Sequence, residues 1–167
     1  MCTTLASEPH NLPTAVLSVD DLYLPHSQQK ALAQSHPQNP LVQHRGQPST
    51  HDIALGRALF AALGNRDANI KIPSYDKSAF SGQGDRADES SWHLVNSDKT
   101  DRKIEVVVFE GWCVGFRALS QETLQDKWQR AKEAAQEASY KGQLGRHAFE
   151  SVEFVNNSLK NYDYLTE

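Results

Sequence analysis

Cysteine is scarce in this chain of 167 residues, and long apolar runs are missing altogether. The two cysteines, Cys2 and Cys113, offer neither a disulfide framework nor the spacing of a metal site, so a reducing compartment is the simplest interpretation. No run reaches the roughly 18 apolar residues of a membrane helix. Residues 1–13 lack the basic and apolar regions of a signal peptide. These absences predict a cytoplasmic protein without a membrane contact.

An excess of basic residues is also missing. The chain has 17 Lys and Arg against 21 Asp and Glu, a net charge of −4, so no nucleic-acid partner is expected, because phosphate binding usually requires a basic face. Hydrophobic residues make up 38% of the chain, as in ordinary globular proteins, and there is no internal repeat. We therefore expect one domain over residues 1–167, and by default a monomer.

Two short apolar runs stand out against this composition. The first, Ala15–Val19, stops at Asp20 and Asp21, and the second, Ile104–Phe109, stops at Glu110. Nearly continuous apolar runs are typical of strands that are covered on both faces, as in a parallel sheet. Ligands of open α/β sheets bind outside the carboxyl ends of the strands, so acids at these places are well positioned for chemistry.

The remaining segments predict helices and a ribbon. Residues 50–63 predict a helix with Ser49 or Thr50 as its N-cap, and residues 120–139 and 149–159 predict two more. Strand, helix and strand in this order predict an α/β fold with a parallel sheet and flanking helices. Residues 68–96 predict a ribbon and a lid loop: 70–75 and 92–95 would pair, with a mobile loop over 78–91 at the tip.

The acids after the two runs allow two interpretations. Asp20 directly follows a buried strand, where partial desolvation would suit a base that accepts a hydroxyl proton; the alternative is that Asp20 or Asp21 merely caps the next turn. Glu110 after an apolar strand is typical of a carboxylate that holds magnesium directly or through water. Hydrophobic strands that end in an acid are nevertheless common.

Two loops offer further polar groups. Arg45–Asp52 combines a guanidinium, a glycine and a predicted helix N-terminus, which suits an anionic group, although a capped loop-to-helix junction would look the same. Pro73–Arg86 brings together side chains that a lid over phosphates would use, and a plain solvated loop is the alternative; these side chains are Tyr75, Asp76, Lys77 and Arg86.

Four segments, in their order along the chain, resemble one family. VLSVDDLYLPH, NPLVQHRGQPSTHD, IKIPSYDKSAFSGQGDR and VVVFEGWCVGFRAL resemble the fungal and plant D-glycerate 3-kinase group, which is similar to uridine kinase, phosphoribulokinase and pantothenate kinase. The resemblance covers residues 12–164. It implies a sheet like that of the P-loop nucleoside triphosphate hydrolases. It also implies an ATP- and magnesium-dependent kinase that phosphorylates a hydroxyl of glycerate or a similar small acid.

The resemblance also implies roles for single residues. Asp20, with Asp21 beside it, would activate the acceptor hydroxyl or help to place magnesium, and Glu110 would lie next to the metal and the nucleotide. Asp20 and Glu110 would thus be the magnesium ligands. Lys77 would face the phosphates of the nucleotide. The acceptor would be bound by Tyr23, Arg45, His51, Tyr75, Asp76 and Arg86.

One element of such kinases is missing from the 167 residues. P-loop enzymes grip the nucleotide with G-x-x-x-x-G-K-[ST], and no such sequence occurs here. The resemblance therefore implies a partial kinase domain, the acceptor-side half, without the phosphate-loop strand and the last strands. That strand would be a common neighbour of the strands at 15–19 and 104–109. We expect exposed strand edges and no turnover by this chain alone. The alternatives are a non-catalytic remnant that binds a small acid or a partner protein, and an unrelated α/β scaffold.

Overall fold

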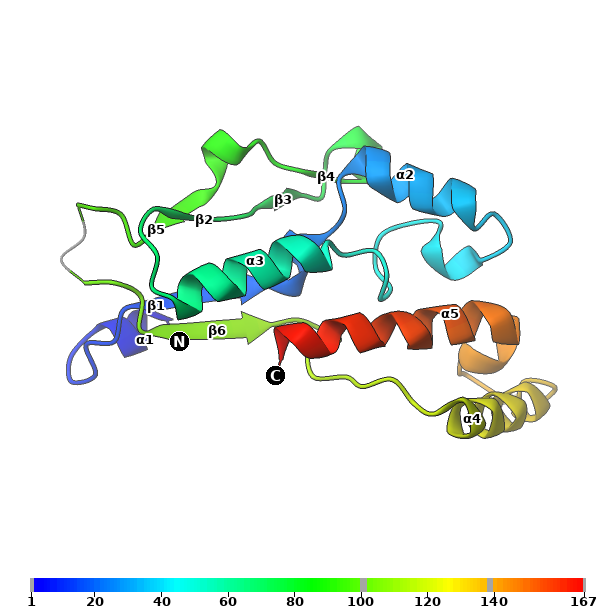
Figure 1. Ribbon diagram of the computed structural model, residues 1–167. Coiled ribbons are helices and arrows are strands. Elements are labelled where there is room, and N and C mark those ends of the chain that lie inside the picture. The colour runs from blue at the N-terminus through cyan, green and yellow to red at the C-terminus, as the bar shows by residue number, and fades with distance from the viewer. Residues whose placement is uncertain (1, 100–101, 138–139, 167) are drawn as a thin grey trace.

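A parallel pair of strands forms the centre of the computed structural model, which describes residues 2–99, 102–137 and 140–166 (Figure 1). β1 (Thr14–Ser18) pairs with β6 (Val106–Glu110) in register from Thr14 opposite Val106 to Ser18 opposite Glu110. The predicted parallel strands are confirmed. The expected common neighbour between them is wrong, because β1 and β6 pair directly with each other along their whole length. Among the described residues this sheet has these two strands.

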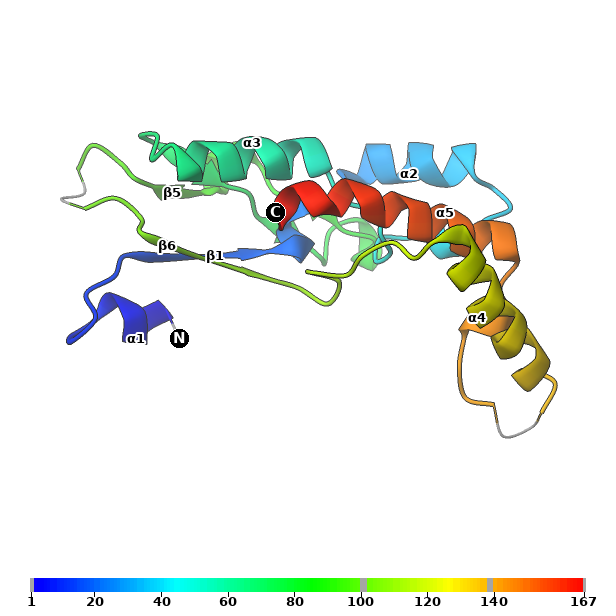
Figure 2. The ribbon, with the colours of Figure 1, turned by 60° about the horizontal axis from the view of Figure 1, so that its bottom comes forward.

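One face of the β1–β6 pair is covered by α3 (Ile53–Gly64), as Figure 2 shows. Ala15 and Leu17 of β1 point to this face and are buried, whereas Val16 between them is 45% exposed. This alternation follows from the two-residue period of a strand. Each fully buried aliphatic side chain stabilises the fold by roughly 1.5–3 kcal/mol. The core between the sheet, α3 and the ribbon described below consists of Ala15, Leu17, Leu59, Leu63, Ile70, Ile72 and Val95.

The start of α3 differs from the prediction. Asp52 is the N-cap, and its side chain accepts the N–H of Leu55 over 2.9 Å. Thr50 cannot begin the helix because its segment is extended: the N–H of Leu24 donates to the Thr50 carbonyl, and the N–H of Asp52 donates to the Leu22 carbonyl. These bonds form an antiparallel bridge, so the helix begins only after it. The bridge ties the end of the β1 loop to the start of α3.

The predicted ribbon is present as β2 (Ile70–Ile72) and β5 (His93–Val95), which pair in the antiparallel sense. Short regular pieces make up much of the loop over 78–91, and its mobility stays a prediction. β3 (Tyr75–Asp76) pairs with β4 (Asp85–Arg86), and 3-10 turns cover 80–82 and 89–91. Arg45, outside the loop, donates to the carbonyls of Gly82 and Gln83 at its tip, which is a long-range restraint that the loop sequence cannot show.

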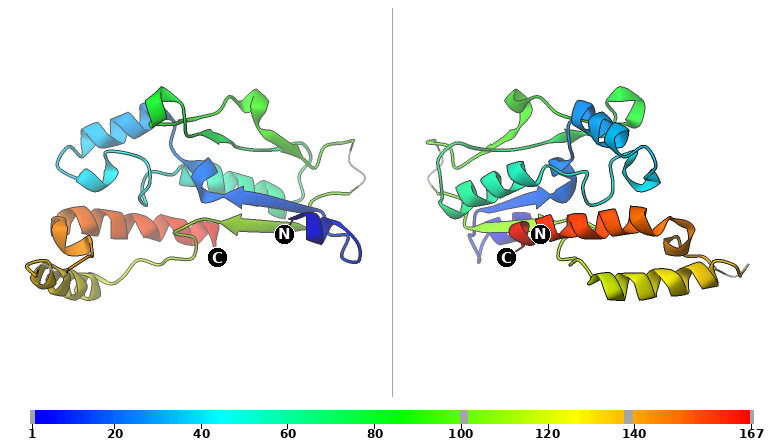
Figure 3. Two further views of the ribbon diagram at one scale, coloured as in Figure 1. Left: turned by 180° about the vertical axis from the view of Figure 1, so that it is seen from behind. Right: turned by 45° about the vertical axis from the view of Figure 1, so that its right-hand side comes forward.

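Three further helices flank the centre. α2 (His26–Ser35) is absent from our sequence-based expectations, since Gln29 is its one buried residue and no apolar stripe marks it. α4 (Gln121–Ala134) begins after Ser120 as predicted but ends earlier, and residues 138 and 139 of the predicted helix lie outside the described residues. α5 (Phe149–Leu159) has the predicted bounds. α4 contacts α5, and the ring of Trp128 meets that of Phe149 edge-on at the start of α5 (Figure 3).

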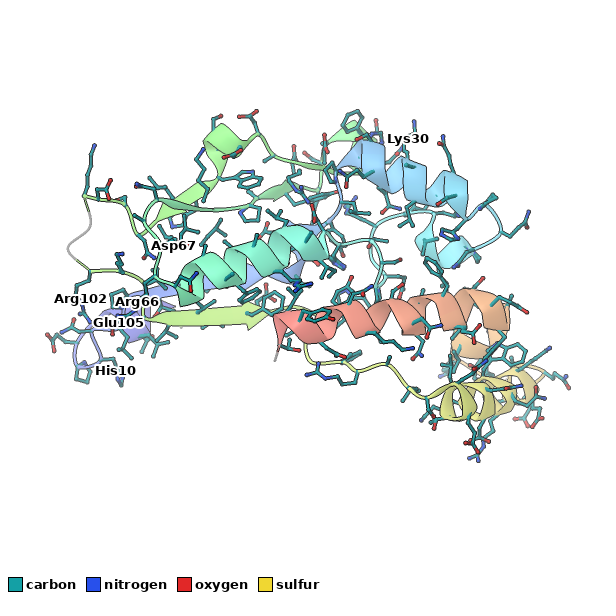
Figure 4. All side chains as sticks on the ribbon, in the orientation of Figure 1. His10, Lys30, Arg66, Asp67, Arg102 and Glu105 are labelled. Carbon is teal, nitrogen blue, oxygen red and sulfur yellow. The ribbon has the colours of Figure 1, made fainter. Side chains whose placement is uncertain are left out.

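The two ends of the β1–β6 pair differ in character. α1 (Cys2–Ala6) lies by the N-terminal end, where Figure 4 places His10, Arg102 and Glu105, and Arg102 and Glu105 form an ion pair of 2.6 Å. Two 3-10 helices, Val19–Leu22 and Lys160–Leu165, meet at the carboxyl end. None of the helices in the described part of the chain has the length and hydrophobicity needed to cross a membrane.

Candidate active site

A pocket of about 550 Å³ opens beyond the carboxyl end of β1. Four of the residues that we predict from the sequence meet there although they come from three separate segments: Asp20 and Tyr23, Arg45, and Lys77. The other four lining residues are not predicted from the sequence. His44 is the neighbour of Arg45, and residues 81–83 form the tip of a hairpin, so no motif in the sequence marks them as part of a site. The full lining is Asp20, Tyr23, His44, Arg45, Lys77, Ser81, Gly82 and Gln83.

Asp20 and Lys77 form the charged pair of this pocket. Lys77 Nζ lies 2.7 Å from Asp20 Oδ2, and both side chains remain partly exposed. Burial raises the pKa of Asp20, but the hydrogen bond and the charge of Lys77 outweigh it, so the pKa lies below its ordinary value. A partly exposed ion pair of this kind contributes at most about 1 kcal/mol to stability. The pair therefore matters for the placement of opposite charges rather than for the fold.

Tyr23 is the aromatic wall of the pocket. Its ring stacks on that of His51, with centroids 4.3 Å apart, and meets the ring of Tyr75 edge-on at 5.4 Å. Burial, followed by the charge of Asp20, raises the pKa of Tyr23 far above its ordinary value, so the hydroxyl keeps its proton. The ring thus offers an apolar face with a neutral hydroxyl beside the Asp20 carboxylate.

His51 lies behind this wall and does not line the pocket. Its side chain is buried, its Nδ1 lies 2.5 Å from the hydroxyl oxygen of Tyr162, and its Nε2 has no hydrogen-bond partner among the described residues. Burial lowers the pKa of His51 from its ordinary 6.5 to about 4, although the charge of Asp20 opposes the shift. The imidazole is therefore neutral at neutral pH.

The buried imidazole predicts a loss of stability in acid. The unfolded chain binds a proton at His51 near pH 6.5, while the folded chain resists it down to about pH 4, so acidification in this window favours unfolding. We expect the free energy of unfolding to fall by about 2 kcal/mol between pH 7 and pH 5 through this residue. Urea unfolding at several pH values measures it. His51→Gln should flatten the slope and His10→Gln, at an exposed site, should not; equal slopes in all three proteins would contradict the assignment.

The two arginines hold the walls of the site together. Arg45 donates to the carbonyls of Gly82, Gln83 and Lys77, and so fixes the tip of the β3–β4 hairpin over the pocket. Arg86 binds Asp52 at 3.0 Å and the Tyr23 carbonyl at 3.1 Å, and does not itself line the pocket. Nε of Arg86 is buried and has no hydrogen-bond partner in the part of the chain that the structure describes. Both guanidinium groups are thus held by partners within the protein, Arg45 by carbonyls and Arg86 by a carbonyl and a carboxylate.

Three acids that the resemblance places in the site lie outside the pocket. Asp21 accepts the N–H of Tyr75 over 3.2 Å and faces a separate cavity of about 430 Å³; burial raises its pKa. Asp76 is exposed and bonds the hydroxyl and the N–H of Ser78, which lowers its pKa. Glu110 is exposed at the end of β6, opposite Ser18 in the register.

A magnesium ion of the kinase type would need carboxylates beside the phosphates of the substrate. Within the described ranges, no group of three or more His, Cys, Asp or Glu side chains could hold a metal ion. Magnesium in kinase sites is held by one or two carboxylates together with the phosphates of the substrate. Asp20, two residues beyond Ser18, and Glu110, opposite Ser18, follow neighbouring parallel strands. Two carboxylates at this edge fit the protein's share of such a site.

Comparisons with known proteins relate the chain to kinases. No protein-family model matches the chain. It is 50% identical over 103 residues to the uncharacterized kinase mug58 of Schizosaccharomyces pombe, covering 61% of this chain and 36% of that protein. It is 39% identical over 109 residues to the chloroplastic D-glycerate 3-kinase of Arabidopsis thaliana, covering 64% and 23%. The chain thus spans about a quarter to a third of these relatives' length.

A solved structure extends the likeness to the fold. The D-glycerate 3-kinase of Cryptococcus neoformans superposes with a TM-score of 0.84 at 34% identity, covering 98% of this chain and 53% of that one. The interpretation as an unrelated α/β scaffold is therefore wrong. The chain has the mixed α/β fold of a P-loop kinase, and its homologues are D-glycerate 3-kinase and related ATP-dependent kinases.

Proposed function

We propose that this chain forms the acceptor side of an ATP-dependent kinase that phosphorylates a hydroxyl of D-glycerate or a similar small hydroxy acid. One observation carries the proposal: Asp20 and Lys77 face each other in one pocket at 2.7 Å. A hydroxy acid has the complementary groups: its hydroxyl can donate to the Asp20 carboxylate, and its own carboxylate can accept from the Lys77 ammonium group. The likeness to D-glycerate 3-kinases supports the same substrate class.

Asp20 would accept the hydrogen bond of the acceptor hydroxyl and orient its oxygen for attack. The lowered pKa of Asp20 keeps the group charged, which favours orientation over early removal of the proton. This is sufficient chemically, because phosphoryl transfer passes through a loose transition state that needs positioning more than a strong base. Tyr23 would exclude water from one side of the acceptor, and the hairpin tip held by Arg45 would cover another.

ATP and magnesium belong to the proposal. Magnesium, when bound, would neutralise the phosphate charges, and Asp20 and Glu110 are the carboxylates that we propose as its ligands. Lys77 remains our candidate for the phosphates of the nucleotide as well, since one ammonium group can move between an acceptor carboxylate and a phosphoryl oxygen. Asp21, His51, Asp76 and Arg86 lie outside the pocket lining, so for them we propose support of the site rather than contact with the acceptor.

Removal of the Lys77 charge tests the acceptor site directly. We expect Lys77→Met to weaken the binding of D-glycerate about tenfold, because a charge-assisted bond to the carboxylate is lost. Isothermal titration calorimetry of the 167-residue chain without ATP measures the affinity. Lys127→Met, at an exposed site on α4, is the matched control. A folded wild-type chain that binds no D-glycerate would refute the acceptor site. An unchanged affinity in Lys77→Met would show that Lys77 does not bind the acceptor, and the phosphates of the nucleotide would remain as its proposed ligand.

A non-catalytic protein that binds a small acid is the second candidate. The observation in its favour is that no G-x-x-x-x-G-K-[ST] sequence occurs in the 167 residues. Formation of ADP that depends on D-glycerate, measured after the phosphate-loop segment of a D-glycerate 3-kinase is joined to the chain, separates the two candidates. The absence of turnover by this chain alone stays a prediction. Location in the cytoplasm, a monomeric state and the absence of a nucleic-acid partner also remain predictions; the Arabidopsis relative is named as chloroplastic.

A further inference from the structure

Tyr162 lies far from the pocket in sequence, yet its hydroxyl reaches the segment that carries His51. It belongs to the 3-10 helix Lys160–Leu165, which follows α5 and ends beside α3 in Figure 1. The N–H of Ser49 donates to Tyr162 Oη over 3.2 Å, and Nδ1 of His51 lies 2.5 Å from the same oxygen. Tyr162 and His51 are each 4% exposed. A buried polar group that lacks a hydrogen-bond partner destabilises the fold. The direction of the two hydrogen bonds at Tyr162 Oη can therefore be inferred from which groups have a proton to donate.

Proton accounting favours one arrangement at this oxygen. A backbone N–H can only donate, so Ser49 uses Tyr162 Oη as an acceptor, and the hydroxyl keeps one proton of its own to donate. If that proton goes to Nδ1 of His51, the ring carries its own proton on Nε2. In the reverse arrangement Nδ1–H would donate, and the Tyr162 proton would have no acceptor among the described residues. The first arrangement leaves one fewer buried group unpaired.

We propose that Tyr162 is a positioning residue for the pocket: its hydroxyl holds His51 as the neutral tautomer with the proton on Nε2 and thereby fixes the ring on which Tyr23 stacks. The inference rests on the proposed function of the pocket. Tyr162 meets the His51 ring edge-on, with centroids 5.6 Å apart, while Tyr23 covers the face of that ring at an interplanar angle of 19°. Tyr23 in turn lines the pocket beside Asp20.

Tyr162 is itself held rigidly enough for this role. It belongs to a buried cluster that reaches both the start of the Asp20 loop and the segment after β6, and its members are Val19, Leu22, Cys113, Tyr162 and Leu165. Leu165 closes against α3 so tightly that a Cβ on Gly56 would stand 3.0 Å from its Cδ2. A close-packed surrounding leaves a ring few alternative rotamers. The position of the hydroxyl is therefore set by the core and not by the pocket.

The His51 tautomer can be read directly from the nitrogen-15 spectrum of its ring. We would record long-range proton–nitrogen correlations of the labelled 167-residue chain as wild type, Tyr162→Phe and Tyr164→Phe. Tyr164 is 62% exposed in the same helix and provides a matched loss of one hydroxyl. We expect the Nε2–H form alone in the wild type and in Tyr164→Phe. Tyr162→Phe should show a mixture of both tautomers and a weaker nuclear Overhauser effect between the rings of His51 and Tyr23.

Each outcome decides the inference. An Nδ1–H form in the wild type would overturn it without any variant, which covers the case that Tyr162→Phe does not fold. An unchanged tautomer and ring contact in folded Tyr162→Phe would overturn it as well. The link to function is read separately by calorimetry: we expect D-glycerate to bind about fivefold more weakly to Tyr162→Phe and equally to Tyr164→Phe, the size expected for one lost hydrogen bond. If the wild type binds no D-glycerate, the proposed function fails, while the tautomer spectra still decide the role of Tyr162.

Discussion

Asp20→Asn is expected to lower the turnover of D-glycerate by about 100-fold or more without weakening the binding of D-glycerate. A carboxylate that orients the hydroxyl and takes up its proton as the transfer proceeds contributes roughly 10²- to 10⁴-fold to such reactions, and the isosteric amide cannot take up the proton. Asparagine also releases Lys77, which is paired with Asp20 at 2.7 Å, and the freed ammonium group can bind the acceptor carboxylate. The expected signature is thus a loss in kcat with an equal or lower KM.

The measurement requires a form that turns over ATP. We would join the phosphate-loop segment of a D-glycerate 3-kinase to the N-terminus of this chain and compare steady-state kinetics of the parent and the variant. Asp126→Asn is the matched control, because Asp126 forms an exposed pair with Arg130 on α4 and should leave both constants unchanged. An unaltered kcat in Asp20→Asn would remove Asp20 from the chemistry. A raised KM with a normal kcat would make it a binding residue only.

Gly111→Ala is expected to destabilise the fold by about 3–5 kcal/mol, from overpacking and backbone strain together. Gly111 follows Glu110 directly and has φ +155°, and a Cβ there would stand 2.1 Å from Cγ1 and 2.8 Å from Cβ of Val19. Val19 is completely buried at the start of the Asp20 loop and cannot give way. The glycine is therefore what allows the segment after β6 to pass over the end of β1.

Gly46→Ala separates backbone strain from overpacking as causes of the lost stability in Gly111→Ala. Gly46 has φ +142°, but a Cβ there would have nothing within 4 Å, so it adds backbone strain without a clash. We expect a loss of about 1–2 kcal/mol in this control. Urea unfolding followed by circular dichroism measures both variants. Equal losses would show that backbone strain alone is responsible and that Val19 does not confine the residue at position 111.

The strands could be predicted because their determinants are local in sequence. The apolar runs at 15–19 and 104–109 and the acids that follow them fix β1, β6 and the polar edge of the sheet within a residue or two. α5 is equally local, since its bounds agree with the prediction. α2 is not predicted because its sequence, HSQQKALAQS, has no stripe of apolar residues at helical spacing. Its buried residue is Gln29, which donates to the Val42 carbonyl. Tertiary contact rather than periodicity makes that segment helical.

The composition of the site depended on contacts that cross long stretches of chain. Lys77 reaches Asp20 across 57 residues, and Arg45 reaches the hairpin tip across 37 and 38 residues. Arg86 looks like a substrate-binding residue in the sequence, but Asp52 takes up its charge. Asp76 looks equally suitable, yet it bonds its neighbour Ser78. A charged residue near a site in sequence is free for a ligand only if no internal partner uses it, and partners are set by the fold.

The sequence by itself determined the class of the fold, the parallel strands, the acids at their ends and the likeness to D-glycerate 3-kinases, because apolar runs, end residues and motif order are properties of the linear chain. Only the tertiary structure decided that Asp20 and Lys77 face each other, that Asp21 and His51 stay out of the pocket lining, and that Tyr162 contacts His51. Burial and pairing of polar groups arise when distant segments pack together, and each pairing removes a donor, an acceptor or a charge that the sequence alone would leave available.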